Sequence, residues 1–454
     1  MSLAAITDWP WRGWQLRCPD ALAIDAGQQR LSWRQLGQAI SGQAAGFRQQ
    51  GVNAGDLVTL RSGNSLDALL AWLGLLTCGA RVLGLNPGLP GDQLDALLPG
   101  LSADFMLNLA ETVAVPLPAL TLTRGRGESS LPWQPERIAT LTLTSGSTGL
   151  PKAAAHTFAA HLYSAAAVAT LMDAQRHDRW LLSLPLYHVS GQGILWRWLR
   201  VGATLVIPDA HGFHAALARS TLASLVPTQL WRLLQQPALP GSLRAVLLGG
   251  AQIPGELTRK AEEAGLRCYC GYGMTETAST VCARRADHRS GVGAPLPGYQ
   301  VRLVEGEVWV RSPALASGYW SAGALRPLAD ADGWLHTGDR GRWLQDELVI
   351  DGRRDNLFFS GGEGVQPEQI EKIVQAHPAV TQVFIVPQAS AEYGQRPVAL
   401  VEGGIALDRL AAWAAPRLAG YQRPVAWYPL PAAEGGSLKR SRQQLKAWVA
   451  QQQK

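Results

Sequence analysis

The sequence predicts an α/β protein: a large N-terminal domain of α/β subdomains with mostly parallel sheets, followed by a small α+β C-terminal domain. Two patterns carry this prediction. Over roughly the first 300 residues, short apolar runs alternate with helix-like stretches, as in strand–helix–strand units. Beyond that point, apolar and polar residues alternate as in a half-buried strand. A chain of 454 residues is also too long for one compact core.

The first part of the chain supports the strand–helix alternation segment by segment. The helix-like stretches are residues 31–50, 66–77, 156–172 and 254–264. The short apolar runs that we expect to be strands are residues 81–85, 140–144, 203–207 and 244–248. Because such runs stand next to helix-like stretches, we expect parallel strands joined by helices.

The C-terminal part begins after a charged, glycine-containing segment at residues 351–356. Before it, residues 307–311 alternate as a half-buried strand and residues 348–350 form another apolar run. After it, we expect helices over residues 367–375, 408–418 and 441–451 and a strand over residues 380–386. We therefore expect one domain over residues 1–352 and a second over residues 353–454.

Composition limits the classes of partner. Hydrophobic residues make up 47% of the chain and charged residues 17%, which suits a protein with a sizeable core. The net charge of +6 is mild and no long basic run carries it, so the chain suits anionic small molecules better than nucleic acid. Five cysteines without Cys-x-x-Cys spacing argue against a disulfide framework or a structural zinc site.

We expect neither a targeting segment nor a membrane segment. The N-terminus has no basic head followed by an apolar stretch, so no signal peptide is expected. Residues 68–80 are too few to span a bilayer, and residues 153–172 are too polar because they include two histidines and several hydroxyl side chains. We therefore expect no stable membrane insertion and a cytoplasmic location. The sequence does not indicate an oligomeric state.

The strongest chemical motif is Thr-Leu-Thr-Ser-Gly-Ser-Thr-Gly-Leu-Pro-Lys at residues 142–152. A β-rich run leads into hydroxyls and glycines whose backbone N–H groups can approach a phosphate, and Lys152 adds a positive charge. An ordinary surface loop explains the whole string less well than a phosphate-binding loop does. A Walker A loop is excluded because Pro151 and Ala153 stand where it requires Gly and Ser or Thr. A nucleophile elbow is excluded because Gly-x-Ser-x-Gly is not satisfied.

Further blocks of glycines, hydroxyls and charged residues follow along the chain. They are Leu-Pro-Leu-Tyr-His at 184–188, Gly-Gly-Ala-Gln-Ile-Pro at 249–254, Gly-Tyr-Gly-Met-Thr-Glu at 271–276, Thr-Gly-Asp at 337–339, Gly-Arg-Arg-Asp at 352–355, Ser-Gly-Gly-Glu-Gly at 360–364 and Lys-Arg-Ser-Arg at 439–442. Each block alone is explained by a turn, a solvated linker or an exposed tail. Their occurrence together, in this order, is not explained in that way.

Taken together, these blocks resemble the acyl-adenylate-forming superfamily, which includes acyl- and aryl-CoA ligases, peptide-synthetase adenylation domains and luciferases. The resemblance covers essentially the whole chain. Within the superfamily, the sequence is most similar to the family of o-succinylbenzoate–CoA ligases of menaquinone synthesis. That closer similarity depends on residues 8–12, 182–193, 196–198 and 355–364.

The resemblance implies two half-reactions. The carboxylate of the acid, here 2-succinylbenzoate, attacks the α-phosphate of ATP in the presence of Mg²⁺ and gives an acyl-adenylate and pyrophosphate. The thiolate of coenzyme A then displaces AMP. The catalytic residues implied are Lys439, Thr144, Thr275 and His188. The usual Gly-Lys-Ile/Leu-x-x-Arg pattern around the lysine is degraded, but Arg442 still follows Lys439 by three positions.

The same resemblance assigns residues to the other ligands. The phosphate-binding residues are Ser145, Gly146, Ser147, Thr148, Gly149 and Lys152. The adenine-lining residues are Gly249, Gly250, Ala251, Gly271, Tyr272 and Gly273. The remaining assignments are Glu276 to Mg²⁺, Asp339 to the ribose, Arg353 to the ribose or phosphate edge, Asp355 to a hinge, and Gly361 and Gly362 to the coenzyme A channel. The small domain is expected to be mobile, swinging about the hinge between the half-reactions.

The acid-binding residues are inferred from charge placement. Between His188 and Arg200, the one formally charged residue is Arg197, and tryptophans flank it. A guanidinium in apolar surroundings requires an anion and can hold a carboxylate with two hydrogen bonds. We expect Arg197, with Ser190 and Gln192 nearby, to bind the aromatic carboxylate of 2-succinylbenzoate. The alternative is that Arg197 points to solvent from a helix. His188 either gates the acyl site or packs as a structural side chain.

Two other functions remain open at this point. One is a CoA ligase for another aryl or fatty acid with the same machinery. The other is a non-catalytic acyl-adenylate-binding protein that kept the fold. The retained Lys152, Glu276, Asp339 and Lys439 argue against the second.

Overall fold

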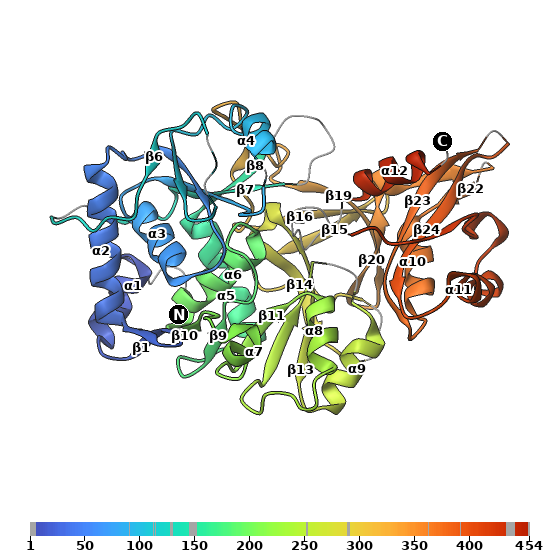
Figure 1. Cartoon of the computed structure of the whole chain (residues 1–454), viewed down its shortest axis with the longest axis horizontal. Helices are drawn as coiled ribbons and strands as arrows, with labels where there is room; N and C mark the ends of the chain where they lie inside the picture. Colours follow the sequence, from blue (N-terminus) through green and yellow to red (C-terminus); the bar gives the residue numbers. More distant parts are fainter. Residues whose placement is uncertain are drawn as a thin grey trace.

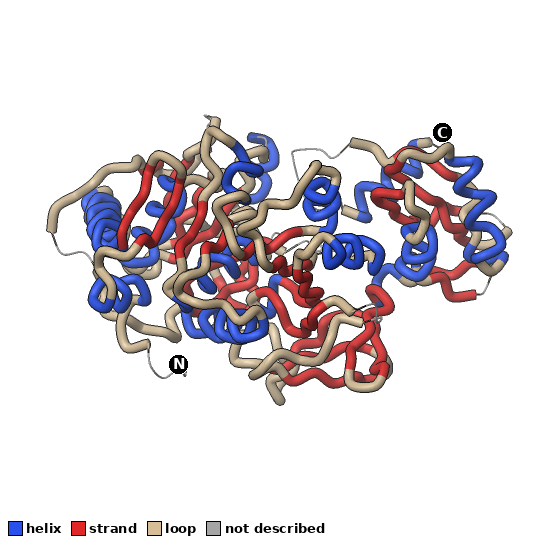
Figure 2. Tube along the Cα trace, turned by 90° about the horizontal axis from the view of Figure 1, so that it is seen from below, coloured by secondary structure: helices blue, strands red, loops and turns tan. Residues whose placement is uncertain are grey.

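The computed structural model describes most of the chain. The described residues are 6–89, 91–111, 113, 115–127, 130–144, 152–250, 253–287, 291–361, 363–390, 392–432 and 441–452. A large N-terminal part contains three sheets, and a small C-terminal unit with its own sheet lies at one end of the long axis in both views (Figure 1, Figure 2). The α/β fold class and the two-part architecture predicted from the sequence are confirmed.

The first sheet carries the strands that flank the hydroxyl-rich loop. Its order is β18-β17-β8-β7-β4-β3-β5-β6. The bounds are β3 (Leu57–Arg61), β4 (Arg81–Leu85), β5 (Phe105–Asn108), β6 (Ala119–Leu120), β7 (Ile138–Leu143), β8 (Ala153–Thr157), β17 (Gly318–Ser321) and β18 (Ala324–Arg326). Strands β3 to β7 pair in parallel, whereas β8, β17 and β18 add antiparallel strands at one edge.

The second sheet carries the glycine-rich block around residues 271–276. Its order is β14-β13-β12-β11-β9-β10-β1-β2, and the strands are parallel except for the outermost pair at each edge. The bounds are β1 (Leu22–Ala26), β2 (Gln29–Ser32), β9 (Arg179–Leu181), β10 (Thr204–Val206), β11 (Leu222–Leu225), β12 (Ala245–Leu248), β13 (Arg267–Met274) and β14 (Ser279–Arg285). The edge pair β13–β14 is where the chain leaves the parallel pattern, just beside the Thr275–Glu276 segment.

Helices surround these two sheets. They are α1 (Pro10–Arg17), α2 (Trp33–Gln49), α3 (Leu66–Thr77), α4 (Gly91–Leu97), α5 (Phe158–Leu171), α6 (Val189–Val201), α7 (Gly212–Leu217), α8 (Pro227–Leu234) and α9 (Gly255–Glu263). Helix α2 begins after Ser32, whose side chain accepts from the backbone N–H of Gln35 in a capping box. The largest core cluster includes Trp72, Trp180 and Trp196 and joins the helices to both sheets.

A small antiparallel sheet follows, in the order β15-β16-β19-β20. Its strands are β15 (Gln300–Val304), β16 (Glu307–Arg311), β19 (Leu335–Leu344) and β20 (Glu347–Arg353). The predicted strand over 307–311 is confirmed. The Thr-Gly-Asp block lies within β19 and not in a turn, because the ladder continues past an irregularity in the pairing of β16 with β19, where Gly338 adopts φ +72°.

The C-terminal unit forms its own layers after a 3-10 turn at Arg354–Asn356. Its strands are β21 (Phe358–Ser360), β22 (Glu363–Val365), β23 (Val380–Ser390), β24 (Gly394–Gly403) and β25 (Trp427–Pro429), and its helices are α10 (Pro367–Gln375), α11 (Leu407–Ala414) and α12 (Arg442–Gln451). Two separate core clusters hold these elements together. Helix α10 has the predicted bounds, with Pro367 at its first position.

Two segments differ clearly from the sequence prediction. The α-helix predicted over residues 408–418 ends at Ala414, and a proline-containing 3-10 turn over Ala415–Arg417 follows it. We predicted a helix over residues 156–172, but residues up to Thr157 belong to strand β8 and the helix begins at Phe158. Alanines 153–155 favour a helix by propensity, yet they lie fully buried between β7 and β17 and complete the backbone pairing of both. Tertiary pairing therefore overrides the local preference. Within the described part of the chain, no helix combines the length and the apolar character that crossing a membrane requires.

Candidate active site

The base of the hydroxyl-rich loop is closed by two antiparallel strands. Strand β7 ends just before Thr144, and β8 begins just after Lys152. The backbone N–H of Thr144 donates to the carbonyl oxygen of Lys152 at 3.2 Å, and the Thr144 hydroxyl donates to the same oxygen at 3.4 Å. The predicted phosphate-binding residues Ser145, Gly146, Ser147, Thr148 and Gly149 lie outside the described residues.

Lys152 and Glu276 meet at a side chain that the sequence did not identify, Tyr319. The ammonium of Lys152 lies 4.2 Å from the centre of the Tyr319 ring. The Tyr319 hydroxyl donates to Oε1 of Glu276 at 2.8 Å. The structure therefore brings the predicted phosphate cation and the predicted metal ligand to one tyrosine. No motif marks Tyr319, because the pairing of β17 with β8 joins segments that are far apart in sequence.

Thr275 and Glu276 stand on a 3-10 turn (Thr275–Thr277) directly after β13. Gly271, Tyr272 and Gly273 lie in the last part of β13. Gly249 follows the neighbouring strand β12, and a Cβ added there would lie 3.7 Å from the carbonyl oxygen of Gly271. The structure thus brings together the predicted adenine-lining segments, except Ala251, which lies outside the described residues. Gly250 adopts φ +81°, a conformation that favours glycine.

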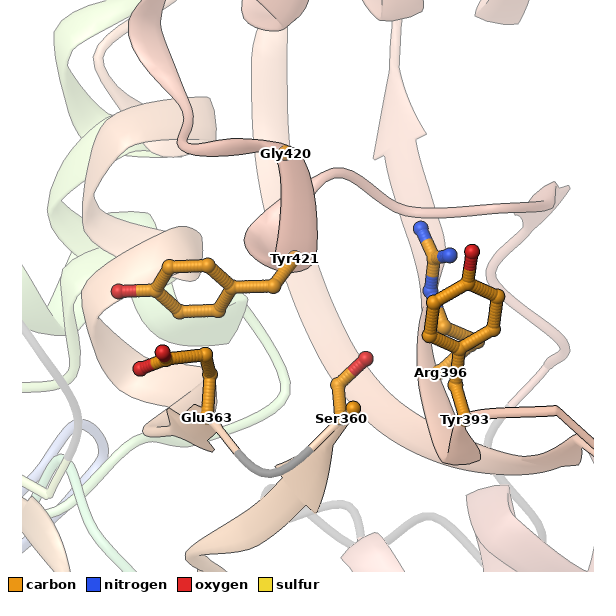
Figure 3. A pocket seen from close by; sticks show the side chains of 7 residues that line it. Ser360, Glu363, Tyr393, Arg396, Gly420 and Tyr421 are labelled. Atoms are coloured by element: carbon orange, nitrogen blue, oxygen red, sulfur yellow. The ribbon is translucent and has the colours of Figure 1, made fainter.

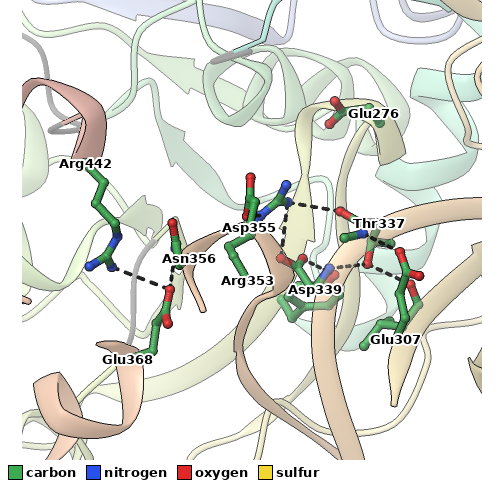
Figure 4. A network of polar contacts seen from close by, with 12 residues as sticks. Glu276, Glu307, Thr337, Asp339, Arg353, Asp355, Asn356, Glu368 and Arg442 are labelled. Atoms are coloured by element: carbon green, nitrogen blue, oxygen red, sulfur yellow. Dashed lines mark hydrogen bonds and ion pairs between the residues drawn. The ribbon is translucent and has the colours of Figure 1, made fainter. Parts of the chain in front are cut away.

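A polar network surrounds Asp339 (Figure 4). The Tyr272 hydroxyl donates to Oδ2 of Asp339 at 2.6 Å. Nη1 of Arg353 donates to Oδ1 of Asp339 at 3.2 Å and to the carbonyl oxygen of Thr337 at 3.0 Å. Burial raises the pKa of Asp339 above its ordinary value even though both partners favour the carboxylate. We call Tyr272, Thr337, Asp339 and Arg353 the Asp339 network.

Charged pairs flank the predicted hinge residue Asp355 on both sides (Figure 4). Asp355 accepts from Nε of Arg353 at 3.1 Å. Arg354 pairs with the buried Glu307 in the N-terminal part. On the other side, Asn356 donates to Glu368, which also pairs with Arg442 of the C-terminal unit.

Arg197 lies in α6 and is only 1% exposed, so the alternative that it points to solvent is wrong. Nη1 donates to the Ser224 hydroxyl at 3.3 Å and Nη2 to the Ser279 hydroxyl at 3.0 Å. Within the described parts of the chain, no carboxylate pairs with this guanidinium, and its Nε has no partner. Burial lowers the pKa of Arg197 to about 10, so it keeps its charge at neutral pH. We call Arg197, Ser224 and Ser279 the Arg197 cluster.

The Arg197 cluster lies next to the segment that carries Glu276. Ser279 opens β14 only three residues after Glu276. It adopts φ +116°, a strained conformation for a residue with a side chain. In this conformation the Ser279 hydroxyl accepts from Arg197 at the end of the predicted nucleotide-binding block.

The other predicted acid-site residues occupy the start of α6. Ser190 lies half-buried in the first turn. Gln192 is fully buried, and its amide N–H groups donate to the Thr142 hydroxyl at 3.0 Å and to the carbonyl oxygen of Leu186 at 3.1 Å. Gln192 therefore holds the end of β7 that leads into the hydroxyl-rich loop. His188 stands at the N-terminal end of α6 with its ring 4.7 Å from that of Tyr187.

The C-terminal unit contributes a pocket of about 280 Å³ beside Gly361 (Figure 3). It is lined by the rings of Tyr393 and Tyr421, by Glu363 and by Arg396. The Arg396 guanidinium lies 4.7 Å from the centre of the Tyr393 ring. Two other predicted residues of this unit, Gly362 and Lys439, lie outside the described residues.

Glu276 fits the Mg²⁺ ion implied by the resemblance. Among the described residues, no group of three or more His, Cys, Asp and Glu side chains could hold a metal by itself. Mg²⁺ does not need such a cage, since it keeps several waters and binds one or two carboxylates together with substrate phosphates. A half-buried carboxylate with one oxygen bound to Tyr319 is a hard oxygen donor of this kind.

The fold and these segments define a nucleotide-binding enzyme that activates carboxylates, and comparison with known proteins agrees. Residues 12–320 match the family model described as AMP-binding enzyme. The chain therefore belongs to the AMP-binding enzyme family.

The full-length relatives carry a more specific name than the family does. The chain is 51% identical to the 2-succinylbenzoate–CoA ligase of Escherichia coli, covering 98% of this chain and 99% of the relative. It is 42% identical to the Haemophilus influenzae enzyme of the same name, covering 97% and 98%.

Solved structures point the same way. A variant of Escherichia coli MenE with bound OSB-AMS has a TM-score of 0.93 at 50% identity, covering 98% of this chain and 99% of that one. The o-succinylbenzoate CoA synthetase of Bacillus subtilis, in complex with ATP and magnesium, has a TM-score of 0.84 at 25% identity, covering 97% and 99%.

Proposed function

We propose that this chain joins 2-succinylbenzoate to coenzyme A, with ATP as the energy source, in the pathway to menaquinone. The reaction passes through an acyl-adenylate and releases AMP and pyrophosphate. The observation that carries the proposal is the buried Arg197, which has no carboxylate partner among the described residues, beside the nucleotide-binding segments. The identity to 2-succinylbenzoate–CoA ligases over nearly the whole chain supports the same substrate.

The nucleotide is bound by the segments brought together around β13. Tyr272 and the glycine backbones at 249–250 and 271–273 line the adenine, and Asp339 accepts from the ribose hydroxyls. Arg353 holds Asp339 in place and reaches the ribose or phosphate edge. Lys152, the residues 145–149 and Thr275 supply the positive charge and N–H or O–H donors for the phosphates.

Glu276 would hold Mg²⁺, which supplies charge neutralisation to the phosphates when it is bound. The protein's own part is to bring two anions together. An oxygen of the succinyl carboxylate attacks the α-phosphorus, the bond to the β-phosphate oxygen breaks, and pyrophosphate leaves. Lys439, delivered from the C-terminal unit, stabilises the charge that develops between the carboxylate and the α-phosphate.

The aromatic carboxylate of the substrate, which is not activated, binds Arg197. A planar guanidinium donates two parallel hydrogen bonds to a carboxylate, which an ammonium does not. Ser224 and Ser279 hold the guanidinium from two strands, so it needs little reorganisation to meet the anion. Ser190 stands about two turns before Arg197 in α6, and His188 packs against Tyr187 at the N-terminal end of that helix. Gln192 supports the site through the end of β7.

The second half-reaction uses the other face of the C-terminal domain, residues 353–454, which moves against residues 1–352 about Asp355. The movement withdraws Lys439 and presents Gly361 and Gly362 to the acyl-adenylate. The coenzyme A thiolate attacks the acyl carbon, and the bond to AMP breaks. The pocket beside Gly361, with two aromatic rings and a guanidinium, suits the nucleotide part of coenzyme A (Figure 3).

A cytoplasmic location is part of the proposal. The five free cysteines and the use of ATP and coenzyme A as co-substrates support it.

The experiment that tests the function is acid-dependent exchange of labelled pyrophosphate into ATP, run with a panel of acids. 2-Succinylbenzoate should support exchange far better than benzoate or a fatty acid, and only it should then consume coenzyme A thiol efficiently. A preference for a monocarboxylic acid would instead indicate a different CoA ligase. No exchange with any acid in the presence of Mg²⁺ would indicate a binding protein without catalysis.

Replacing the tail lysine tests the moving domain. Lys439→Ala should abolish pyrophosphate exchange but leave thioester formation from synthetic acyl-adenylate intact, because only the first half-reaction uses that lysine. Exchange at the wild-type rate would contradict the assignment of Lys439.

A further inference from the structure

Tyr319 touches two charged side chains of opposite sign. Its ring lies under the ammonium of Lys152 at 4.2 Å, and its hydroxyl donates to Glu276 at 2.8 Å. Lys152 and Glu276 do not form an ion pair with each other; each contacts the tyrosine instead. An aromatic ring attracts a cation through its face, while a phenol donates best to an anion, so both contacts are favourable at once.

The backbone fixes Tyr319 in this place. Strand β17 pairs antiparallel with β8, and Tyr319 lies opposite Ala154, two residues after Lys152. The N–H of Ala316 donates to the carbonyl oxygen of Glu276 at 2.8 Å. The same short segment is thus tied both to the strand that carries Lys152 and to the turn that carries Glu276, and the ring cannot drift away from either.

The hydroxyl contact orients the carboxylate. The Tyr319 hydroxyl donates to Oε1 of Glu276 and so fixes one oxygen of that side chain. A metal-binding carboxylate that is oriented by such a hydrogen bond binds its metal more tightly than one that rotates freely.

We propose that Tyr319 is a positioning residue for Mg-ATP: its hydroxyl orients Glu276 toward the metal, and its ring holds Lys152 apart from Glu276 until the phosphates bind. Without the tyrosine, the ammonium and the carboxylate could approach and neutralise each other. The incoming Mg-ATP would then have to separate them. The proposal rests on the roles proposed above for Lys152 and Glu276.

Two substitutions separate the two contacts. Tyr319→Phe removes the hydroxyl but keeps the ring over Lys152, whereas Tyr319→Leu removes both. Tyr319→Phe should raise the Mg²⁺ concentration for half-maximal pyrophosphate exchange by about tenfold, as expected when the partner of a metal ligand is lost. Tyr319→Leu should in addition raise KM for ATP at saturating Mg²⁺.

A binding measurement gives a second readout. Calorimetric titration of ATP into the full chain, at a low and at a high Mg²⁺ concentration, should show that Tyr319→Phe weakens ATP binding only at the low concentration. Thioester formation from synthetic acyl-adenylate needs no Mg-ATP and should stay at the wild-type rate. The matched control is Tyr428→Phe in the C-terminal unit, where the ring packs edge-on against Trp448. It should change none of these values.

The outcomes distinguish this proposal from the function on which it rests. If Glu276→Gln changes the Mg²⁺ dependence and Tyr319→Phe does not, the role of Tyr319 is wrong and that of Glu276 stands. If neither changes it, Glu276 is not the metal ligand. A variant Tyr319→Phe that unfolds at lower urea and loses both half-reactions equally would show a structural tyrosine and overturn the proposal.

Discussion

Arg197 and Arg353 are both guanidiniums of the candidate site, yet their surroundings differ. Arg353 is 44% exposed at its side chain and is paired with the carboxylates of Asp339 and Asp355. Arg197 is buried, donates to the hydroxyls of Ser224 and Ser279, lies 5.9 Å from the centre of the Trp180 ring, and has no carboxylate partner among the described residues. The guanidinium of Arg353 is already paired with carboxylates before any ligand binds, whereas that of Arg197 has no carboxylate partner among the described residues.

This difference between the two arginines indicates which of the two sites needs a charged group on its ligand. A buried cation without a counter-ion is unfavourable, and its burial lowers the pKa of Arg197 to about 10. A ligand carboxylate that reaches it recovers much of that cost, so the Arg197 cluster selects for a second negative group. The Asp339 network needs no ligand charge, and its acceptor oxygens suit neutral hydroxyl groups such as those of a ribose.

The largest effect is expected from removing the uncompensated charge. Arg197→Ala should lower kcat/KM for 2-succinylbenzoate by about 100-fold or more, because the aromatic carboxylate loses a desolvated partner. Arg197→Lys should lower it less, since it keeps the charge but not the fork of donors. KM for ATP should stay near the wild-type value in both variants. If KM for the acid barely changes in either, the Arg197 cluster does not bind the substrate.

The Asp339 network should respond in the opposite way. Asp339→Asn keeps the shape of the side chain but removes its charge and weakens the bonds from Tyr272 and Arg353. We expect KM for ATP to rise by about tenfold, a typical loss for a hydrogen bond to a charged group, while KM for 2-succinylbenzoate stays unchanged. Pyrophosphate exchange with one substrate varied at a time measures both. Equal changes in the two KM values would remove the distinction between the regions.

The sequence predicts the Asp339 network better than the Arg197 cluster. Tyr272, Asp339 and Arg353 each belong to a recognisable block, and the structure joins them directly. Arg197 stands out because it is the lone charge in an apolar stretch. Its partners Ser224 and Ser279 lie on β11 and β14, in no motif, and only the folded sheet brings them to the same guanidinium.

The fold, too, is predicted well only where the signal is local in sequence. Helix α3 and strand β4 have the predicted bounds because an uninterrupted apolar helix and a short apolar run are local signals. The sequence does not predict strand β8 because its alanines favour a helix, and the pairing that overrides them comes from β7 and from the distant β17. Tyr319 was missed for the same reason. Local patterns predict elements, whereas contacts between distant strands decide which side chains meet.

Acid should destabilise the folded chain. His156 is fully buried near His161, which stacks on Trp196, and burial lowers the pKa of His156 from its ordinary 6.5 to about 4. Between those values the unfolded chain binds a proton that the folded chain does not. Stability therefore falls as the pH drops through this window, by about 2 kcal/mol from about pH 7 to about pH 5 for this one histidine.

The substitution His156→Gln removes that titration. Urea unfolding at the two pH values should show a smaller acid-induced loss for this variant, whereas His177→Gln, at an exposed position, should behave like the wild type. An acid-induced loss that is the same in His156→Gln and the wild type would mean that His156 does not titrate in this window.

The smallest expected effect comes from crowding Arg197 without touching its charge. Gly193 lies one turn before it in α6, and a Cβ there would lie 3.1 Å from Nη2 of Arg197 and 3.3 Å from Oγ of Ser279. Gly193→Ala should gain about 0.5–1 kcal/mol from the helix backbone and lose ~1 kcal/mol by overpacking, so stability in urea should hardly change. KM for 2-succinylbenzoate should still rise by about fivefold, because the guanidinium must shift, while KM for ATP stays constant.

Gly255→Ala in α9, where a Cβ meets open space, serves as the control. If Gly193→Ala leaves the acid KM unchanged, the guanidinium that it crowds is not the one that the substrate meets.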